Sequence, residues 1–356
     1  MKLKAINAGL IKRFDRENML GLLESFPSQC DKALATGKRA EVPGRYRRKY
    51  ADIVFAGMGG SGIGGSIIKD YLAGEARVPL TVVKDYTLPG FVGKNTLVFI
   101  TSYSGDTEET LSVYREAVRK RADIIVTTSG GKAEKIARKN RDMLILIPGG
   151  QPPRSALGYS MLPALTVLGR MGIVADKTGP IKRMISTLRK LVEGDLGHTA
   201  GPNAAVGIAS RIYGRLPVIY TSAHMESVAL RWRGQLAENS KVLATCHVLS
   251  EMNHNEIEGW QKPPDILKKA AAVFIRDKGE GPEIMKRMAA TKDIIGESGC
   301  IVVEAGSKGS ELLQRIMSAI YIGDFVSFYL SMMNGVDPTP VTRISYLKKK
   351  LAGRAK

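Results

Sequence analysis

The sequence predicts an α/β fold with two mostly parallel sheets, each flanked by helices on both faces. Short apolar segments alternate with helical patterns between residues 50 and 150. This alternation is typical of a parallel sheet that helices cover on both sides. The same alternation returns, more weakly, after residue 205. A chain of 356 residues is long enough for two such domains.

The first domain begins with a helical segment near residues 20–23, which we expect to end before Pro27. Five short apolar runs follow, and each is predicted to form a buried strand: 52–56, 80–83, 97–101, 124–127 and 144–147. Helical patterns at 107–121 and 132–141 separate the later strands. The sequence therefore predicts five parallel strands.

Residues 149–153, GGQPP, mark a boundary. An apolar helix is predicted over 155–175, with a kink allowed at Pro163, and a basic amphipathic helix over 181–191. Residues 194–202 have the composition of a linker. The middle of the chain is thus predicted to be a pair of connecting helices.

The second half repeats the strand and helix pattern. Strands are predicted at 216–221, 271–275 and 301–305, and helices at 224–240, 281–298 and 310–333. A short basic helix ends the chain. We therefore predict four parts: an N-terminal domain with a leading helix at 1–150, linker helices at 151–200, a second domain of similar topology at 201–335 and a tail helix at 336–356.

The chain carries a formal net charge of +19. Binding of nucleic acid would need this charge gathered on one face, ideally with aromatic residues interleaved, but aromatic residues make up only 6% and the basic residues are spread. A solvated basic surface is the simpler interpretation, and we expect no nucleic-acid partner. Such a field would also speed the arrival of a dianionic substrate.

The three cysteines Cys30, Cys246 and Cys300 are far apart and odd in number. Without any C-x-x-C pattern we expect neither a disulfide framework nor a zinc site, which fits a reducing cytoplasm. The N-terminal residues contain no apolar core of a signal peptide. We also find no uninterrupted run of about 18 apolar residues, so no membrane span is expected.

Two loops at the ends of predicted strands suggest a phosphate site. The first, at 57–62, is GMGGSG, and a helical pattern follows it. Glycines allow close approach of the backbone, and the unpaired N–H groups and dipole of a helix N-terminus favour an anion. The second loop, at 101–110, is rich in hydroxyl groups. Because parallel strands end at one edge, both loops can close on one phosphate, held by Gly60, Ser61, Ser102, Ser104 and Thr107.

Other interpretations of these loops remain open. Glycines and hydroxyl residues also serve ordinary turns and helix caps. The spacing of Gly57, Gly59 and Gly62 also satisfies a dinucleotide fingerprint, with Asp85 near the place of a ribose-binding acid. The hydroxyl loop would have no obvious task in a dehydrogenase. No Walker lysine follows the glycines, so the loop is not a nucleotide P-loop.

The paired motifs GMGGSG and SYSGDTEET resemble the sugar isomerase domain. Further segments resemble the bifunctional phosphoglucose/phosphomannose isomerases: PRSALG at 153–158, AENSK at 237–241, NHNE at 253–256, and DPTP at 337–340 with Leu347-Lys348. The resemblance covers almost the whole chain from about residue 50. One departure is Asp106, where the family often has Asn; we expect its carboxylate to point at the helix start.

The resemblance implies an aldose–ketose isomerase that interconverts glucose 6-phosphate, and mannose 6-phosphate, with fructose 6-phosphate through a cis-enediol. Such chemistry needs a carboxylate base and a cation for the enediolate, but no obligatory metal or cofactor. Glu238 is the expected base, and a surface salt bridge is its structural alternative. Arg154, on a backbone stiffened by two prolines, is expected to stabilise the enediolate; an interdomain salt bridge is its alternative.

Ring opening is assigned to two further residues. His254 lies in a polar Asn-His-Asn-Glu context, and histidine suits proton transfer near neutral pH. In similar enzymes this histidine enters the site from the other subunit, which implies a homodimer. Lys348 takes the second role by resemblance, although a terminal basic helix is usually solvated.

Two other functions remain open. A sugar-phosphate-binding regulator without chemistry would need the phosphate loops but neither Glu238 nor His254. A nicotinamide-dependent dehydrogenase would instead depend on Asp85. For His224 we expect structural capping, and for Trp232 and Trp260 core packing.

Overall fold

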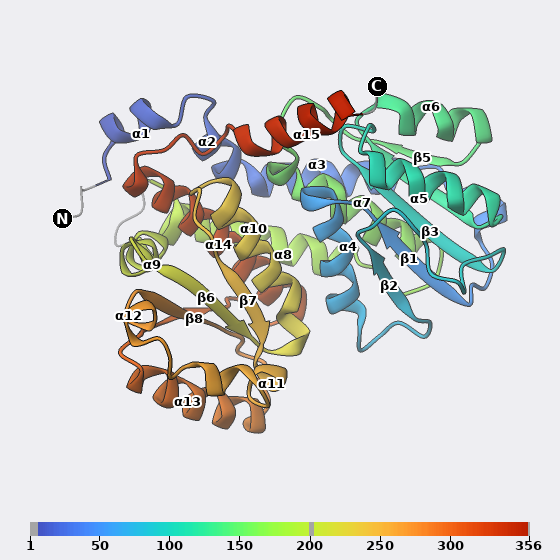
Figure 1. Ribbon diagram of the computed structural model, residues 1–356. Coiled ribbons are helices and arrows are strands. Elements are labelled where there is room, and N and C mark those ends of the chain that lie inside the picture. Colours follow the sequence, from blue (N-terminus) through green and yellow to red (C-terminus); the bar gives the residue numbers. More distant parts are fainter. Residues whose placement is uncertain (1–5, 199–202, 355–356) are drawn as a thin grey trace.

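The computed structural model describes residues 6–198 and 203–354 and contains two parallel sheets, with helices on both faces of each (Figure 1). The predicted fold class is confirmed. The largest core cluster combines side chains of both sheets with the helices between them, among them Phe55 and Phe99 of the first sheet and Val273 of the second. The two sheets therefore share a continuous apolar layer.

The first sheet has the five strands that the sequence predicts. They are β1 Asp52–Ala56, β2 Leu80–Val83, β3 Thr96–Ser102, β4 Asp123–Thr128 and β5 Met143–Leu146, in the order β2-β1-β3-β4-β5. The covering helices include α4 Gly59–Leu72, α5 Glu108–Arg119 and α6 Gly131–Asn140. Alternate residues of β1 face opposite clusters: Ile53 packs toward the shared layer, and Val54 packs toward α5 and α6.

The second sheet has four strands, in the order β7-β6-β8-β9, which repeats the order of the first four strands of the first sheet. They are β6 Leu216–Thr221, β7 Thr245–Val248, β8 Ala270–Arg276 and β9 Ile301–Gly306. The sequence prediction missed β7, because this short edge strand has no apolar run. The helices are α9 Ala204–Ile212, α10 Glu226–Glu238, α11 Leu249–Met252, α12 Pro264–Leu267, α13 Pro282–Glu297 and α14 Leu312–Asn334.

The leading and connecting segments are largely helical. They comprise α1 Ala8–Phe14, α2 Met19–Glu24, α3 Phe26–Arg39, α7 Leu157–Arg170 and α8 Thr178–Leu191. The helix near residue 20 ends before Pro27 as predicted, but Pro27 then lies in the first turn of α3, where its missing N–H costs no hydrogen bond. Of the expected linker, Val192–Leu196 continues α8 as a π-helical turn, and 199–202 lie outside the described residues.

Helix α14 is the central core helix. It is long and apolar enough to cross a membrane by length and composition, although the sequence analysis expected no such segment. In the structure 94% of its most apolar window is buried inside the protein. It packs against α8, α9 and α10, so its apolar character is explained by the core it fills.

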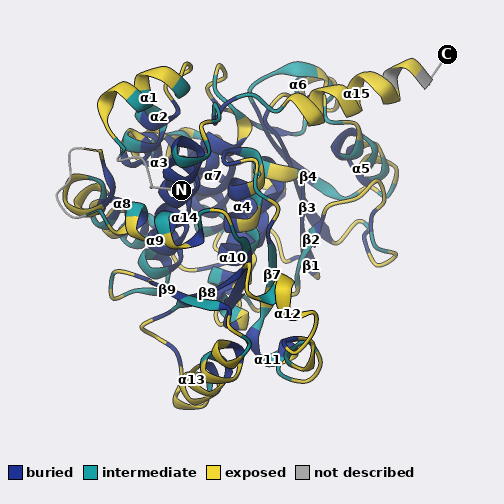
Figure 2. Cartoon of the chain, turned by 60° about the vertical axis from the view of Figure 1, so that its left-hand side comes forward, coloured by how far each residue is buried: buried dark blue, intermediate teal, exposed yellow. Residues whose placement is uncertain are grey.

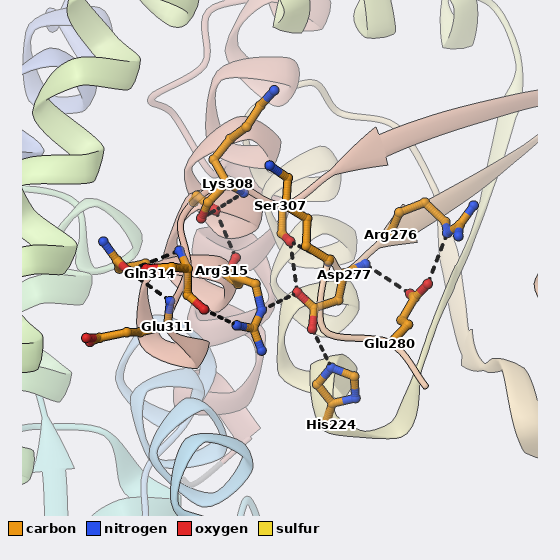
Figure 3. Close-up of polar contacts among 12 residues, drawn as sticks. His224, Arg276, Asp277, Glu280, Ser307, Lys308, Glu311, Gln314 and Arg315 are labelled. Carbon is orange, nitrogen blue, oxygen red and sulfur yellow. Dashed lines mark hydrogen bonds and ion pairs between the residues drawn. The ribbon is translucent and has the colours of Figure 1, made fainter. Parts of the chain in front are cut away.

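In the second sheet, a buried carboxylate lies at the carboxyl ends of the strands (Figure 3). The corresponding edge of the first sheet carries the two predicted phosphate loops. Asp277 directly follows β8, and its side chain is fully buried. Oδ2 lies 2.9 Å from Nε2 of His224, while Ser307 Oγ and Arg315 Nε each donate to Oδ1 at 2.8 Å. His224 thus pairs with a carboxylate across the sheet edge instead of forming a helix cap.

Asp277 together with His224, Ser307 and Arg315 is called the Asp277 cluster below. Its stability depends on the ionisation of Asp277. Burial by itself would raise the pKa of Asp277, but hydrogen bonds from His224 and Ser307 and the charge of Arg315 outweigh it and hold the pKa below its ordinary value. A group with a lowered folded-state pKa stabilises the fold above its unfolded-state pKa, and this stabilisation is lost as pH falls through the folded-state value.

We predict that Asp277→Asn lowers the free energy of unfolding by about 1–3 kcal/mol at pH 7. The difference from the unsubstituted protein shrinks as pH falls from about 4, the ordinary pKa of Asp, through the lower folded-state pKa, because Asp277 then becomes neutral like Asn. Urea unfolding at several pH values measures it, with Glu283→Gln on the exposed face of α13 as the control. A difference that stayed constant down to pH 2 would contradict the role of ionisation.

Candidate active site

The glycine loop after β1 forms the start of α4. The N-terminal residue of α4, Gly59, has φ of +50°, which a side chain would strain. A Cβ on Gly60 would lie 2.9 Å from the backbone N of Arg154 and from Pro153, so only glycine allows this approach. Among the residues that the structure describes, no side chain caps this helix terminus, which leaves the N–H groups of Gly59 and Gly60 free for an anion.

The hydroxyl loop adjoins the glycine loop, as predicted from the shared sheet edge. The backbone N–H of Tyr103 donates to Ser61 Oγ at 3.0 Å, which ties the two loops together. Ser102 and Thr107 are also neighbours, with their hydroxyl oxygens 3.4 Å apart. Ser104 is exposed, and its Oγ accepts from the N–H of Asp106 at 3.3 Å. The five predicted phosphate ligands therefore occupy two adjoining loops.

The side chain of Asp106 points at the start of α6, which is not the helix that directly follows its own loop. Its Oδ1 accepts a hydrogen bond from the backbone N–H of Lys132 at 3.2 Å. Lys132 lies in the first turn of α6. The additional carboxylate of this chain therefore stabilises the next helix along the sheet and is turned away from the start of α5.

A buried guanidinium joins distant parts of the chain. Arg154, only 3% exposed, donates from Nε to Oδ1 of Asn239 at 2.6 Å. Its Nη2 donates to the carbonyl oxygens of Pro338 and Thr339 at 2.7 and 2.8 Å. Its own carbonyl oxygen accepts from Arg231 at 2.6 Å. The position of this cation is thus set by contacts from the second half and the tail.

Glu238 stands beside this cation at the end of α10. Its Oε2 lies 3.5 Å from Nη1 of Arg154, and its side chain is 29% exposed. A carboxylate that is reachable from solvent and adjoins a fixed guanidinium can accept a proton while the cation stabilises negative charge nearby. The structure thus brings Glu238 and Arg154 together from opposite halves of the chain.

One end of α4 and one end of α10 line the same cavity. Asp70, near the end of α4, accepts a hydrogen bond from the N–H of Ser227 at the start of α10 at 2.8 Å. The opposite ends of the same helices, Gly60 and Glu238, line a cavity of about 190 Å³. Because α4 and α10 lie side by side and run in opposite directions, the N-terminus of α4 and the carboxylate of Glu238 face the same cavity.

Three cations that line this cavity were not predicted from the sequence: Lys84, Arg231 and Arg233. Lys84 directly follows β2, at the same sheet edge as the two predicted loops, so its place after a strand was the available signal. Arg233 projects from α10 and had no local signal. Asp85, the residue that a dehydrogenase would need, only accepts from the N–H of Tyr86 at 2.7 Å in a local turn.

Lys348 lies on α15, Thr342–Arg354, an exposed helix that extends away from the body of the protein (Figure 2). The beginning of α15 and Glu238 line a second cavity, of about 420 Å³. Lys241 holds this region together, because its Nζ donates to the carbonyl oxygen of Pro340 at 2.7 Å. Lys348 lines neither cavity within a single chain.

His254 follows α11 and is exposed. Its ring forms no hydrogen bond or ion pair with the described residues and lines neither of the cavities beside Glu238. Its neighbour Glu256 accepts from the hydroxyl of Tyr220 at 2.5 Å, and so fixes the base of this segment. The single chain leaves His254 away from Glu238, so its role and the dimer remain predictions.

The remaining marked residues have structural surroundings. Trp232 is buried in the shared core and donates from Nε1 to the carbonyl oxygen of Ala319 at 2.8 Å. Trp260 donates to the hydroxyl of Tyr220 at 2.8 Å. Among residues 6–198 and 203–354, no group of three His, Cys, Asp or Glu side chains could hold a metal ion.

Comparison with solved structures finds chains of similar fold, several of which are named as phosphosugar isomerases. A hypothetical protein from Thermus thermophilus matches with a TM-score of 0.74 at 15% identity, covering 98% of this chain and 93% of the other. A putative phosphosugar isomerase from Clostridium difficile matches with a TM-score of 0.69 at 13% identity, covering 90% and 95%. These matches establish the fold.

Sequence comparison is more specific. The model of the bacterial phospho-glucose isomerase C-terminal SIS domain matches residues 202–351. A bifunctional phosphoglucose/phosphomannose isomerase from Caldicellulosiruptor bescii is 39% identical, covering 92% of this chain and 97% of the relative. One from Aquifex aeolicus is 35% identical, covering 86% and 92%. At this identity and coverage, the chain belongs to the family of bifunctional phosphoglucose/phosphomannose isomerases.

Proposed function

We propose that the chain is an aldose–ketose isomerase that interconverts glucose 6-phosphate and mannose 6-phosphate with fructose 6-phosphate. One observation carries the proposal: the carboxylate of Glu238 and the buried guanidinium of Arg154 meet beside a cavity that the anion-binding terminus of α4 also lines. Relatives at 35–39% identity bear this activity in their names. The three free cysteines fit the reducing cytoplasm expected for such an enzyme.

The phosphate end of the substrate binds first in this proposal. The free N–H groups at Gly59 and Gly60 and the hydroxyl loop from Ser102 to Thr107 receive the phosphate. The dipole of α4 favours its negative charge. Binding at this end leaves the carbonyl end of the opened sugar free to extend toward Glu238.

Glu238 then moves one proton between two carbons. Its carboxylate removes the proton from C2 of the open-chain aldose while O1 gains a proton, which gives the cis-enediol. Glu238 returns its proton to C1 and the hydroxyl proton leaves O2, which gives the ketose. Arg154 stabilises the negative charge on the oxygens between these steps. Mannose 6-phosphate differs in configuration at C2, so the base must reach C2 from either side.

Ring opening is assigned to His254 of a second subunit and to Lys348. An apolar stripe on α15 supports a homodimer: Ile344, Leu347 and Leu351 recur at helical spacing and are 44, 57 and 51% exposed. Exposed apolar stripes of this kind are typical of contacts between subunits. In this proposal a second copy covers the stripe and completes the site.

We predict that Glu238→Gln lowers both isomerase activities about 10²–10⁴-fold, because the amide cannot accept the proton. A coupled assay of fructose 6-phosphate formation from each aldose, with EDTA present, measures this. Glu283→Gln is the control. Binding of the hexose phosphate is retained, because the phosphate contacts lie elsewhere. Loss of only one activity, or inhibition by EDTA, would contradict the mechanism.

If each site combines Glu238 of one subunit with His254 of the other, two inactive variants should restore activity when they form a mixed dimer. Glu238→Gln and His254→Asn are each inactive as homodimers, but a mixed dimer has one site with both side chains intact. Random re-association therefore restores about a quarter of the unsubstituted activity, since half the dimers are mixed. Activity is measured after dissociation and mixing, with each variant alone as control. A mixture that stays inactive would place His254 within its own chain.

A further inference from the structure

The predicted phosphate ligands carry no formal charge. They are glycine and hydroxyl residues, and the second loop also contains three carboxylates: Asp106, Glu108 and Glu109. A phosphomonoester is close to a dianion at pH 7. Binding it in a partly enclosed space is unfavourable unless positive charge compensates it. The helix dipole supplies about half a charge, so cations are needed.

Two of the four cations beside the cavity, Arg231 and Arg154, already have partners within the protein. Arg231 forms a two-point ion pair with Asp324, at 3.0 and 2.9 Å, and Arg154 is held by Asn239 and the tail carbonyl groups. In contrast, Lys84 forms no ion pair or side-chain hydrogen bond within residues 6–198 and 203–354, and the same holds for Arg233. Two free cations thus line the cavity with Gly59 and Gly60.

These two cations repel each other. Burial lowers the pKa of Lys84, and the charge of Arg233 lowers it further. The carboxylates of Glu226 and Asp70 oppose this effect but make no direct contact with Lys84. Glu238 also lines the cavity, but among the described residues its carboxylate is paired with Arg154 and with neither of these cations. Two like charges at one cavity are unfavourable for the empty protein, and an anion between them relieves the repulsion.

We propose that Lys84 and Arg233 form a cationic subsite that captures and holds the phosphate group of the sugar phosphate. The N–H groups of Gly59 and Gly60, which line the same cavity, orient the phosphate by hydrogen bonds, and the two cations supply the compensating charge. The subsite also selects for phosphorylated over unphosphorylated sugars. The inference rests on the proposed function, because it names the groups that bind the same substrate.

The test compares Lys84→Met and Arg233→Met with the unsubstituted protein. Each change raises the KM for fructose 6-phosphate, and the inhibition constant of inorganic phosphate, about tenfold, while kcat stays within about twofold. The dependence of kcat/KM on sodium chloride becomes shallower, because part of the attracting charge is gone. Lys286→Met, on exposed α13, removes the same net charge far from the cavity and changes neither constant.

The conservative variants Lys84→Arg and Arg233→Lys separate charge from folding. They keep KM within about threefold if charge is what matters. Unchanged KM and phosphate inhibition in both methionine variants would overturn the subsite, and so would a loss confined to kcat. If the unsubstituted protein isomerises no sugar, the proposed function fails, but calorimetric binding of inorganic phosphate still tests the subsite through the same tenfold weakening.

Discussion

The buried guanidinium of Arg154 is the constraint on which the rest of the site depends. Burying a cation is costly unless its donors are satisfied, and here the partners come from the end of α10 and from the tail at Pro338 and Thr339. Satisfying them brings the two halves and the C-terminal segment together. It also presses the backbone of residues 153–154 against Gly60, which leaves room there only for glycine.

The helices between the two sheets position the residues of the candidate site. Helices α4 and α10 run in opposite directions, linked at one end by Asp70 and Ser227, and they open at the other end onto the cavity. Beneath them, Asp324 on α14 pairs with Arg231, which in turn supports the carbonyl group of Arg154. Glu238 and the N-terminus of α4 are therefore positioned by packed helices, as the proposed chemistry requires.

Local patterns were enough to predict the five strands of the first sheet and the two adjoining loops. Apolar runs and glycines act over a few residues, and tertiary packing did not override them here. The short edge strand β7 was missed because pairing with β6, rather than composition, creates it. Lys84, Arg231 and Arg233 were not predicted, because only the folded chain brings the end of β2 and the helix α10 to one cavity. His254 and Lys348 stand apart from Glu238 in one chain, so their roles rest on resemblance.

The Asp277 cluster indicates which of the two similar sheets can bind a ligand at its carboxyl edge. The two sheets share a strand order, and each has loops that could surround a negative group at its carboxyl edge. In the second sheet the side-chain carboxylate of Asp277 already lies between the polar groups of His224, Ser307 and Arg315. An internal group of this kind competes at very high effective concentration with any free ligand. Under the proposed function, this leaves only the edge of the first sheet to bind a sugar phosphate, so we expect one sugar molecule per chain despite the duplicated architecture.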